Sequence, residues 1–466
     1  MAIGRPRPYS SVSVEGMGDP GYDGRPAAGI LARLSAGLDE RREPVAIVLA
    51  VLALAIGVTG LRRPTHTAVA LALGLLLLAR AVALGRPLLR SHLAACVVLL
   101  IAGRVLLDEK HVTLAWVAVI ASGAVIGWPR RAPSAADSDD RRHVWALVDR
   151  SAGDTLAPFA LRTDKTYVFT PDRAAAVAYR VRFGTAIASG DPVGDPEQRQ
   201  AAVESFLDLA ARNGWRAAVL GCSDRMVADW RQHGLRALPI GRDVVVDAAG
   251  FSLDGRKFRN LRQAVQRTHN AGVTTEIVPE RSLTDDQRAE LLQVMRETGK
   301  GEQSRGFAMI LDHVLDGTHP GTFIALARDR SGRAVAFQRY ATADGGRELS
   351  LDVPWRVPGA PNGVDERLIV DVIRWGAEGR AASVSLAFAA FPDLFSTEER
   401  GLVLQTAYRA VRLLDRFIKL ESLYRFVRKF HAFGQQRYVA LRPLQVVWVA
   451  LAALTLEFGS LTKRQR

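Results

Sequence analysis

The feature that most constrains this chain is a group of four apolar runs close to its N-terminus. Each run approaches the ~20 residues that a helix needs to cross the hydrocarbon core of a bilayer. Short polar turns separate them, which is typical of helical hairpins. We therefore predict an α-helical membrane region of four transmembrane helices, formed by residues 44–61, 66–84, 91–107 and 112–128.

The basic residues beside these runs predict their orientation, because Lys and Arg accumulate in short cytosolic loops. The alternate loops carry only Arg62 and Arg63, and then Lys110 beside two acidic residues. We therefore expect a multi-pass protein of the cell membrane, with its N-terminus and everything after the fourth run in the cytosol. The cytosolic flanks contain Arg33, Arg41, Arg42, Arg86, Arg90, Arg130 and Arg131.

Charge and hydropathy divide the chain into further segments. Lys and Arg exceed Asp and Glu by 62 minus 48, or 14, and most of the charged residues follow the apolar runs. Such an excess favours anionic partners such as phospholipid or nucleic acid, although Arg-rich surfaces alone can produce it. The predicted segments are a disordered cytosolic tail (1–43), the membrane region (44–128), a linker (129–142), two α/β subdomains (143–250 and 251–442) and an apolar helix with a basic tail (443–466).

Several kinds of catalytic site are disfavoured by what the sequence lacks. Two cysteines, Cys96 and Cys222, can form neither a disulfide framework nor a four-cysteine zinc site. There is no H-E-x-x-H motif, no paired C-x-x-C, no G-x-S-x-G elbow and no Walker A loop. We therefore expect neither a metal nor a cofactor, and no covalent hydrolase mechanism.

Strand and helix patterns alternate through the polar part of the chain and recur twice, which predicts two similar α/β units in tandem. Strands are predicted at 167–170, 175–183, 185–189, 217–220, 244–247, 273–278, 322–327, 334–340, 348–353 and 383–388. Helices are predicted at 197–212, 226–233, 257–270, 284–298, 364–378 and 402–427. Residues 444–458 are apolar but short for a span, so three alternatives stay open: a helix docked on the domain, an interfacial helix or a fifth span.

Two basic stripes are candidates for phosphate binding, because the guanidinium fork of arginine pairs with phosphate oxygens. On a helix over 257–270, one face carries arginines while Phe258 and Leu261 share another. Solvated helix faces are the alternative interpretation. The first stripe is Arg256, Arg259 and Arg262, and the second is Arg409, Arg412, Arg416 and Lys419, followed by Arg425, Arg428 and Lys429.

A third candidate is the bend R-V-P-G-A-P-N-G at 356–363, which includes Arg356 and Asn362 and joins a predicted strand to a predicted helix. Backbone N–H groups and the helix dipole favour anions at such a bend. Acyltransferases of the GNAT fold hold the pyrophosphate of coenzyme A in a similar loop. Here Pro358 and Pro361 remove two N–H donors, which disfavours acyl-coenzyme A as the donor.

Over residues 143–442 the chain resembles the C-terminal domain of the phosphatidylglycerol lysyltransferase family, the aminoacyl-phosphatidylglycerol synthases, in its short actinobacterial form. The order and spacing of four motifs carry this resemblance. They are S-G-D-P-V-G at 189–194, the Arg-rich stretch at 251–267, L-D-V-P-W-R-V-P-G-A-P-N-G at 351–363 and L-Y-R-F-V-R-K-F-H-A-F-G-Q-Q-R-Y at 423–438.

The resemblance implies tandem GNAT-like acyltransferase folds that move an aminoacyl group from aminoacyl-tRNA to a hydroxyl of a membrane lipid such as phosphatidylglycerol. It implies that Asp352 engages the substrate amino group, and that Lys429 and Arg437 lie near the lipid phosphate and the reacting centre. The family pattern D-x-x-R is altered, since Trp355 stands three residues after Asp352. Proposed substrate-binding residues are Arg256, Arg259, Arg262, Arg356, Asn362, Arg412, Arg416 and Arg428.

Two other functions fit the same sequence. A GNAT-type acyltransferase could use another activated donor, and a non-catalytic membrane protein could bind lipids or RNA through its basic domain. Salt-sensitive binding of tRNA would favour the first function over an acyl-coenzyme A enzyme. Binding without turnover would favour the non-catalytic alternative. The sequence does not predict the amino acid, the acceptor lipid or the oligomeric state.

Overall fold

The computed structural model describes residues 135–298, 307–390 and 420–458, together with scattered residues between 94 and 133. The first two predicted membrane runs, roughly half of the other two, and the tail at 1–43 lie outside the described residues. Within the described ranges, no helix has the length and apolar character to cross a membrane. Contacts divide the chain into Met1–Gly127 and Trp128–Arg466, and the second unit contains the fold considered below.

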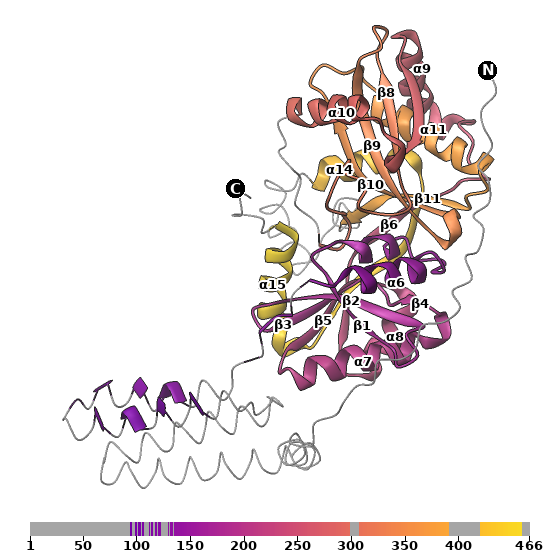
Figure 1. The fold of residues 1–466 in the computed structure, drawn as a ribbon. Helices are drawn as coiled ribbons and strands as arrows, with labels where there is room; N and C mark the ends of the chain where they lie inside the picture. Colours follow the sequence, from indigo (N-terminus) through magenta and orange to yellow (C-terminus); the bar gives the residue numbers. More distant parts are fainter. Residues whose placement is uncertain are drawn as a thin grey trace, which may run out of the picture. The chain divides into compact units, whose positions relative to one another are not determined.

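In the described part of that unit, twelve strands form one sheet in the order β1-β2-β3-β5-β12-β6-β11-β10-β9-β8-β7, with β4 paired to β2 (Figure 1). The prediction of an α/β domain is confirmed. The strands are β1 Thr166–Phe169, β2 Ala175–Arg182, β3 Thr185–Ser189, β4 Val193–Gly194, β5 Arg216–Ser223, β6 Arg236–Asp247, β7 Thr274–Pro279, β8 Thr322–Arg328, β9 Ala334–Ala343, β10 Glu348–Arg356, β11 Ser383–Ala390 and β12 Phe433–Leu441.

Helices cover this sheet, and local sequence explains where several of them begin. The side chain of Thr284 accepts a hydrogen bond from the backbone N–H of Gln287, and the side chain of Gln287 accepts one from the backbone N–H of Thr284. These two bonds form a capping box at the start of α10. The helices are α6 Ser138–Val148, α7 Arg199–Arg212, α8 Val227–Gln232, α9 Arg259–Asn270, α10 Asp285–Glu297, α11 Val364–Glu378, α14 Leu420–Val427 and α15 Val446–Phe458, with 3₁₀ turns η5 Arg256–Phe258, η8 Arg428–Phe430 and η9 Pro443–Gln445.

The same series of elements occurs twice along the chain. In the first half an antiparallel meander ends in β3, helix α7 follows, and β5 pairs parallel to β3. In the second half the meander ends in β10, helix α11 follows, and β11 pairs parallel to β10. The long final strands are exchanged, because β12 pairs with β5 while β6 pairs with β11. The final strand of each half is therefore paired with a strand of the other half. The predicted subdomain boundary at residue 250 stays a prediction.

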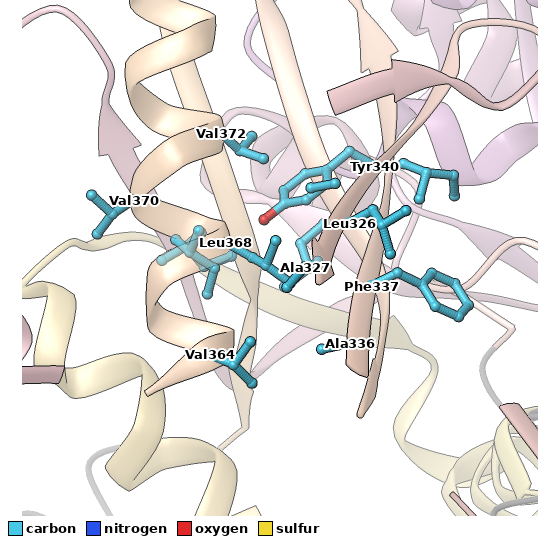
Figure 2. Packing of buried hydrophobic residues seen from close by; sticks show 14 of the residues in the cluster. Leu326, Ala327, Ala336, Phe337, Tyr340, Val364, Leu368, Val370 and Val372 are labelled. Carbon is cyan, nitrogen blue, oxygen red and sulfur yellow. The ribbon is translucent and has the colours of Figure 1, made fainter. Parts of the chain in front are cut away.

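The largest hydrophobic core lies between α11 and the strands β8 and β9 (Figure 2). Val364 and Leu368 on the helix lie on the side of the strands toward which Tyr340 points, whereas Phe337 points to the opposite face of the sheet (Figure 2), and all four are buried. Their spacing on α11 is four residues, which places them on one helix face. Burying each such side chain contributes roughly 1.5–3 kcal/mol, so this apolar face accounts for the helix predicted at 364–378.

Three elements differ most from the sequence predictions. Strand β6 is far longer than the predicted 244–247, and β12 was not predicted, because both strands mix polar and apolar residues without regular alternation. Their pairing in the centre of the sheet is decided by contacts between distant parts of the chain. Helix α6 begins inside the predicted linker, where Asp137 caps it by accepting a 2.8 Å hydrogen bond from the Asp140 N–H.

Candidate functional site

The two parallel strands of the second half diverge, and this divergence locates the candidate site. Strands β10 and β11 pair only where 348–350 lies beside 383–385. Beyond that point β10 continues along β9 and β11 continues along β6. Ligands of α/β folds bind at the carboxyl ends of strands that part in this way. The elements α9, α11, α14 and η8 contact one another beside the diverging strands.

The structure brings the start of the first basic stripe against the end of the second. The rings of Phe258 and His431 pack edge to face with centroids 5.6 Å apart. His431 Nε2 lies 3.2 Å from the carbonyl oxygen of Lys257.

A glycine allows α11 to approach α9 closely beside this junction. Gly363 has a positive φ of 100°, and a Cβ there would lie 2.6 Å from the carbonyl oxygen of Ala264.

We name the exposed cations at this junction the basic cluster: Arg256, Lys257, Arg259 and Arg428. Among the described residues, the three arginines form no ion pair with a carboxylate. Arg262 differs from them, because it donates to the carbonyl oxygens of Leu253 and Gly255 and so holds the preceding loop. The basic cluster is therefore available to a phosphate, whereas Arg262 supports it. Arg412 and Arg416 lie outside the described residues.

The N-terminus of α11 carries its own negative charge. Asp365 and Glu366 occupy its first turn, where the helix dipole favours carboxylates. Arg356 pairs with Asp365 at 3.2 Å, and the Nζ of Lys429 donates to Glu366 at 2.7 Å. The exposed Asn362 stands just before this turn. A pyrophosphate bound at this helix end would meet both carboxylates, which disfavours the coenzyme A arrangement.

Asp352 lies on β10, and both of its carboxylate oxygens have partners inside the domain. One carboxylate oxygen accepts a 2.8 Å hydrogen bond from the Leu311 N–H, and the other pairs with the Arg339 guanidinium of β9. Arg339 also donates to the carbonyl oxygens of Leu311, Asp312 and His313. Burial raises the pKa of Asp352, while the charge of Arg339 opposes that rise. The ion pair therefore fixes residues 311–313 against the sheet, and contact with a substrate amino group stays a prediction.

Arg437 is likewise buried, with 1% of its surface exposed. It lies on the central strand β12 and forms 2.7 Å ion pairs with Asp154 and Asp243. Its remaining donors reach the carbonyl oxygen of Gly221 and the hydroxyl of Thr155, each at 3.1 Å. This guanidinium joins β5, β6, β12 and the segment before β1, so the structure assigns it a cross-linking position within the sheet.

Sequence reasoning missed the partners of these two buried groups. Arg339 is the one basic residue in the apolar strand β9, and Asp243 precedes three valines in β6. A single charge in an apolar strand indicates a buried ion pair, because an unpaired charge there would be strongly destabilising. That signal was present, but the identity of the partner depends on strands far apart in sequence.

A third carboxylate, Asp191, lies beside the Arg437 cluster and predicts a pH dependence of stability. It accepts hydrogen bonds from the N–H and hydroxyl of Ser223. Burial, and then the charge of Asp154, raise its pKa to about 6, while Arg437 opposes the rise. An unfolded aspartate titrates near ~3.9. The folded state therefore holds this proton more tightly, and the stability that it contributes at low pH is lost as the pH rises to about 6.

Replacing Asp191 with asparagine removes that titration. We expect Asp191→Asn to raise the free energy of unfolding by roughly 1–3 kcal/mol above pH 6.5 and to change it little near pH 4. Thermal unfolding of the purified chain in detergent, followed by tryptophan fluorescence at both pH values, measures this difference. Asp208→Asn, at an exposed position of α7, is the control. An equal shift at both pH values would contradict the prediction.

Comparison with known proteins gives the family context of this geometry. Residues 145–441 match a family model described as phosphatidylglycerol lysyltransferase, C-terminal. An MprF-like domain protein of Mycobacterium tuberculosis is 46% identical over 391 residues, which cover 82% of this chain and 80% of that protein. The lysylphosphatidylglycerol biosynthesis bifunctional protein LysX of Gordonia bronchialis is 31% identical over 76% of this chain. The match spans only 32% of that LysX.

Solved structures agree on the fold. The C-terminal domain of a putative lysylphosphatidylglycerol synthetase from Agrobacterium fabrum superposes with a TM-score of 0.61 at 25% identity, covering 70% of this chain and all of that domain. L-PGS from Bacillus licheniformis gives a TM-score of 0.58 at 21% identity over 67% of this chain and 95% of that one. The described domain thus shares the α/β fold of these solved domains.

Proposed function

The chain belongs to the phosphatidylglycerol lysyltransferase family, and from this premise we propose that it transfers an aminoacyl group from aminoacyl-tRNA to a hydroxyl of a membrane lipid such as phosphatidylglycerol. The resemblance inferred from the sequence motifs, and with it the prediction of an aminoacyltransferase family, is confirmed. The observation that supports this activity for the chain is the basic cluster beside the diverging strands β10 and β11.

The chemistry asks little of the protein beyond binding and alignment. Aminoacyl-tRNA is already an activated ester. The protein must therefore align the lipid hydroxyl with the ester carbonyl, help to remove the hydroxyl proton during the attack, and stabilise the oxyanion that forms. The tRNA 3′ hydroxyl leaves with the proton. Neither a metal nor a covalent enzyme intermediate is needed for this balance.

Each charged group has a proposed role that follows from its exposure. Arg256, Arg259 and Arg428 bind phosphates of the tRNA or the lipid, because they are exposed and form no ion pair within the described ranges. Lys429, 41% exposed at its side chain and held by Glu366, faces the acceptor. The buried Asp352 and Arg437 act as positioning residues.

Membrane anchoring is part of the proposal. The four apolar runs at 44–128 hold the domain at the cytosolic face of the bilayer. A lipid acceptor cannot leave the membrane at useful concentration, so an anchored catalytic domain meets it far more often than a free one would.

The test is transfer by the full chain reconstituted in vesicles that contain phosphatidylglycerol. The donor is the total tRNA pool of the native host, charged with labelled amino acids, and mass spectrometry of the extracted lipids identifies the product. We expect an aminoacylated lipid whose mass names both the amino acid and the acceptor. Folded wild-type protein that forms no such lipid would contradict the proposal, and tRNA binding without turnover would favour the non-catalytic alternative.

The basic cluster provides the matched variant. Arg256→Glu/Arg259→Glu is expected to lower transfer at least tenfold and to weaken the salt dependence of tRNA binding, because two phosphate contacts are lost. Arg150→Glu/Arg212→Glu makes the same charge change at exposed positions of the first half and is expected to retain most of the activity. Equal losses in both double variants would show a non-specific charge effect and overturn the assignment of the cluster.

A further inference from the structure

Helix α15 is apolar on both of its faces, although only one of them is covered. Val449, Ala452 and Leu456 pack against the sheet together with Ile187 and Ala218. The opposite side is exposed, reaching 73% exposure at Val447, and Leu444 in the preceding turn η9 is 99% exposed. We name this exposed side, together with Leu444 of η9, the α15 face: Leu444, Val447, Trp448, Leu451 and Leu454.

The α15 face is a fixed part of the domain. Glu457, at the end of the helix, accepts 3.0 Å hydrogen bonds from the backbone N–H groups of Phe307 and Ala308. At the other end the helix follows β12 through the short turn η9. The helix is therefore held at both ends and docked along one side. This arrangement agrees with the helix docked on the domain, one of the three alternatives for residues 444–458. The uncovered apolar side is of the kind that marks a binding surface for a protein or a membrane.

Aromatic and basic residues border this face. The guanidinium carbon of Arg216 lies 4.8 Å from the centre of the Trp448 ring. Arg216 also donates to the carbonyl oxygen of Phe183, a residue of the β2–β3 turn whose side chain is exposed. Arg182 at the end of β2 and Arg442 before α15 are exposed as well. Tryptophan and phenylalanine beside arginine are typical of segments that lie at the headgroup level of anionic membranes.

The path of the chain leads to the same border. Pro129 directly follows the last predicted membrane run, and it packs against the β2–β3 turn, since a Cβ built on Gly184 would lie 2.8 Å from its Cγ. Gly184 stands next to Phe183 in that turn. The residue at which the chain leaves the predicted span is therefore adjacent to the border of the α15 face.

We propose that the α15 face, with Phe183 and the arginines around it, lies in the interface of an anionic bilayer and docks the domain on the membrane that holds its lipid acceptor. The inference rests on the membrane anchoring proposed above. A second copy fits this face less well, because a symmetric pair would bring the bordering arginines of both copies together. An anionic lipid surface instead complements them.

Fluorescence of the full chain in vesicles tests the proposal without using activity. Single cysteines replace Val447, Leu451 or, as a control, Ser331 in the exposed β8–β9 turn, in a chain with Cys96→Ala; the native Cys222 is buried. Each is labelled with an environment-sensitive dye. The vesicles contain phosphatidylcholine and phosphatidylglycerol, with a nitroxide on part of the acyl chains. Dyes at 447 and 451 are expected to be quenched at least twofold by the nitroxide and shielded from aqueous iodide, and the dye at 331 is expected to behave oppositely.

Other quenching patterns would overturn the proposal in distinguishable ways. Quenching by iodide at 447 and 451 would show a face open to water. Shielding from both quenchers would show a face covered by protein, either a second copy or another segment of this chain. Flotation of the same samples with the vesicles reports membrane anchoring separately, so failed anchoring and a failed α15 assignment give different results.

A charge placed on the α15 face gives the functional counterpart. Val447→Asp is expected to lower transfer to phosphatidylglycerol in vesicles about fivefold, and Leu292→Asp, at an exposed leucine of α10, is expected to leave it unchanged. With a short-chain phosphatidylglycerol dissolved in water, Val447→Asp should match the wild type. An equal loss with dissolved and vesicle lipid would overturn the docking role, whereas no transfer by the wild type in either form would count against the proposed activity itself.

Discussion

Replacing Arg437 with methionine is expected to lower the free energy of unfolding by about 3–5 kcal/mol, because it leaves Asp154 and Asp243 buried without their cation. For a domain of this size the loss corresponds to a melting temperature about 10 °C lower. Arg437→Lys keeps the charge but not the fork that joins two carboxylates, so an intermediate loss is expected. Thermal unfolding of the purified full chain measures all three proteins.

A compensating variant separates a structural role from a catalytic one. Asp154→Asn/Asp243→Asn/Arg437→Met removes the buried charges together, and it should regain part of the stability lost by Arg437→Met. A single Arg437→Met variant that melts like the wild type yet transfers no aminoacyl group would instead place this guanidinium at the substrate, as the family resemblance implies.

Replacing Asp352 with alanine is expected to cost about 2–4 kcal/mol of unfolding free energy and more than tenfold in transfer. Among the described residues, the variant leaves the buried Arg339 with one carboxylate partner, Glu280 at 3.6 Å. It also removes the acceptor of the Leu311 N–H, so residues 311–313 lose their attachment to β10. Thermal unfolding and lipid mass spectrometry on the same preparations measure both effects.

The pair Asp352 and Arg339 can be tested as a unit. In Asp352→Ala/Arg339→Met the uncompensated charge is gone, so the double variant should be more stable than the sum of the single losses predicts. If Asp352→Ala unfolds at the wild-type temperature but forms no product, the carboxylate acts on the substrate amino group, and the positioning role is wrong.

Local sequence by itself determined several parts of this protein. The helix at 364–378 and the strand at 185–189 were predicted at the bounds that the structure has, because their side-chain periodicity alone selects the conformation. The start of α10 was predicted to within one residue, at 284, and the capping box that Thr284 forms in the structure accounts for it. The family followed from the order of four motifs, each of which is local. The four membrane runs stay a prediction, since most of their residues lie outside the described ones.

Only the tertiary structure decided which charged residues are available for chemistry. Arg437 and Arg256 look alike in the sequence, yet one is buried between two carboxylates and the other is exposed without an ion pair among the described residues. The partners that decide this come from distant strands, Asp243 from β6 and Arg339 from β9. The same holds for α15, whose covered and uncovered faces are equally apolar. A side chain becomes buried only when the whole sheet has assembled. Because the two halves exchange their final strands, a local sequence pattern cannot predict which charged side chains are buried.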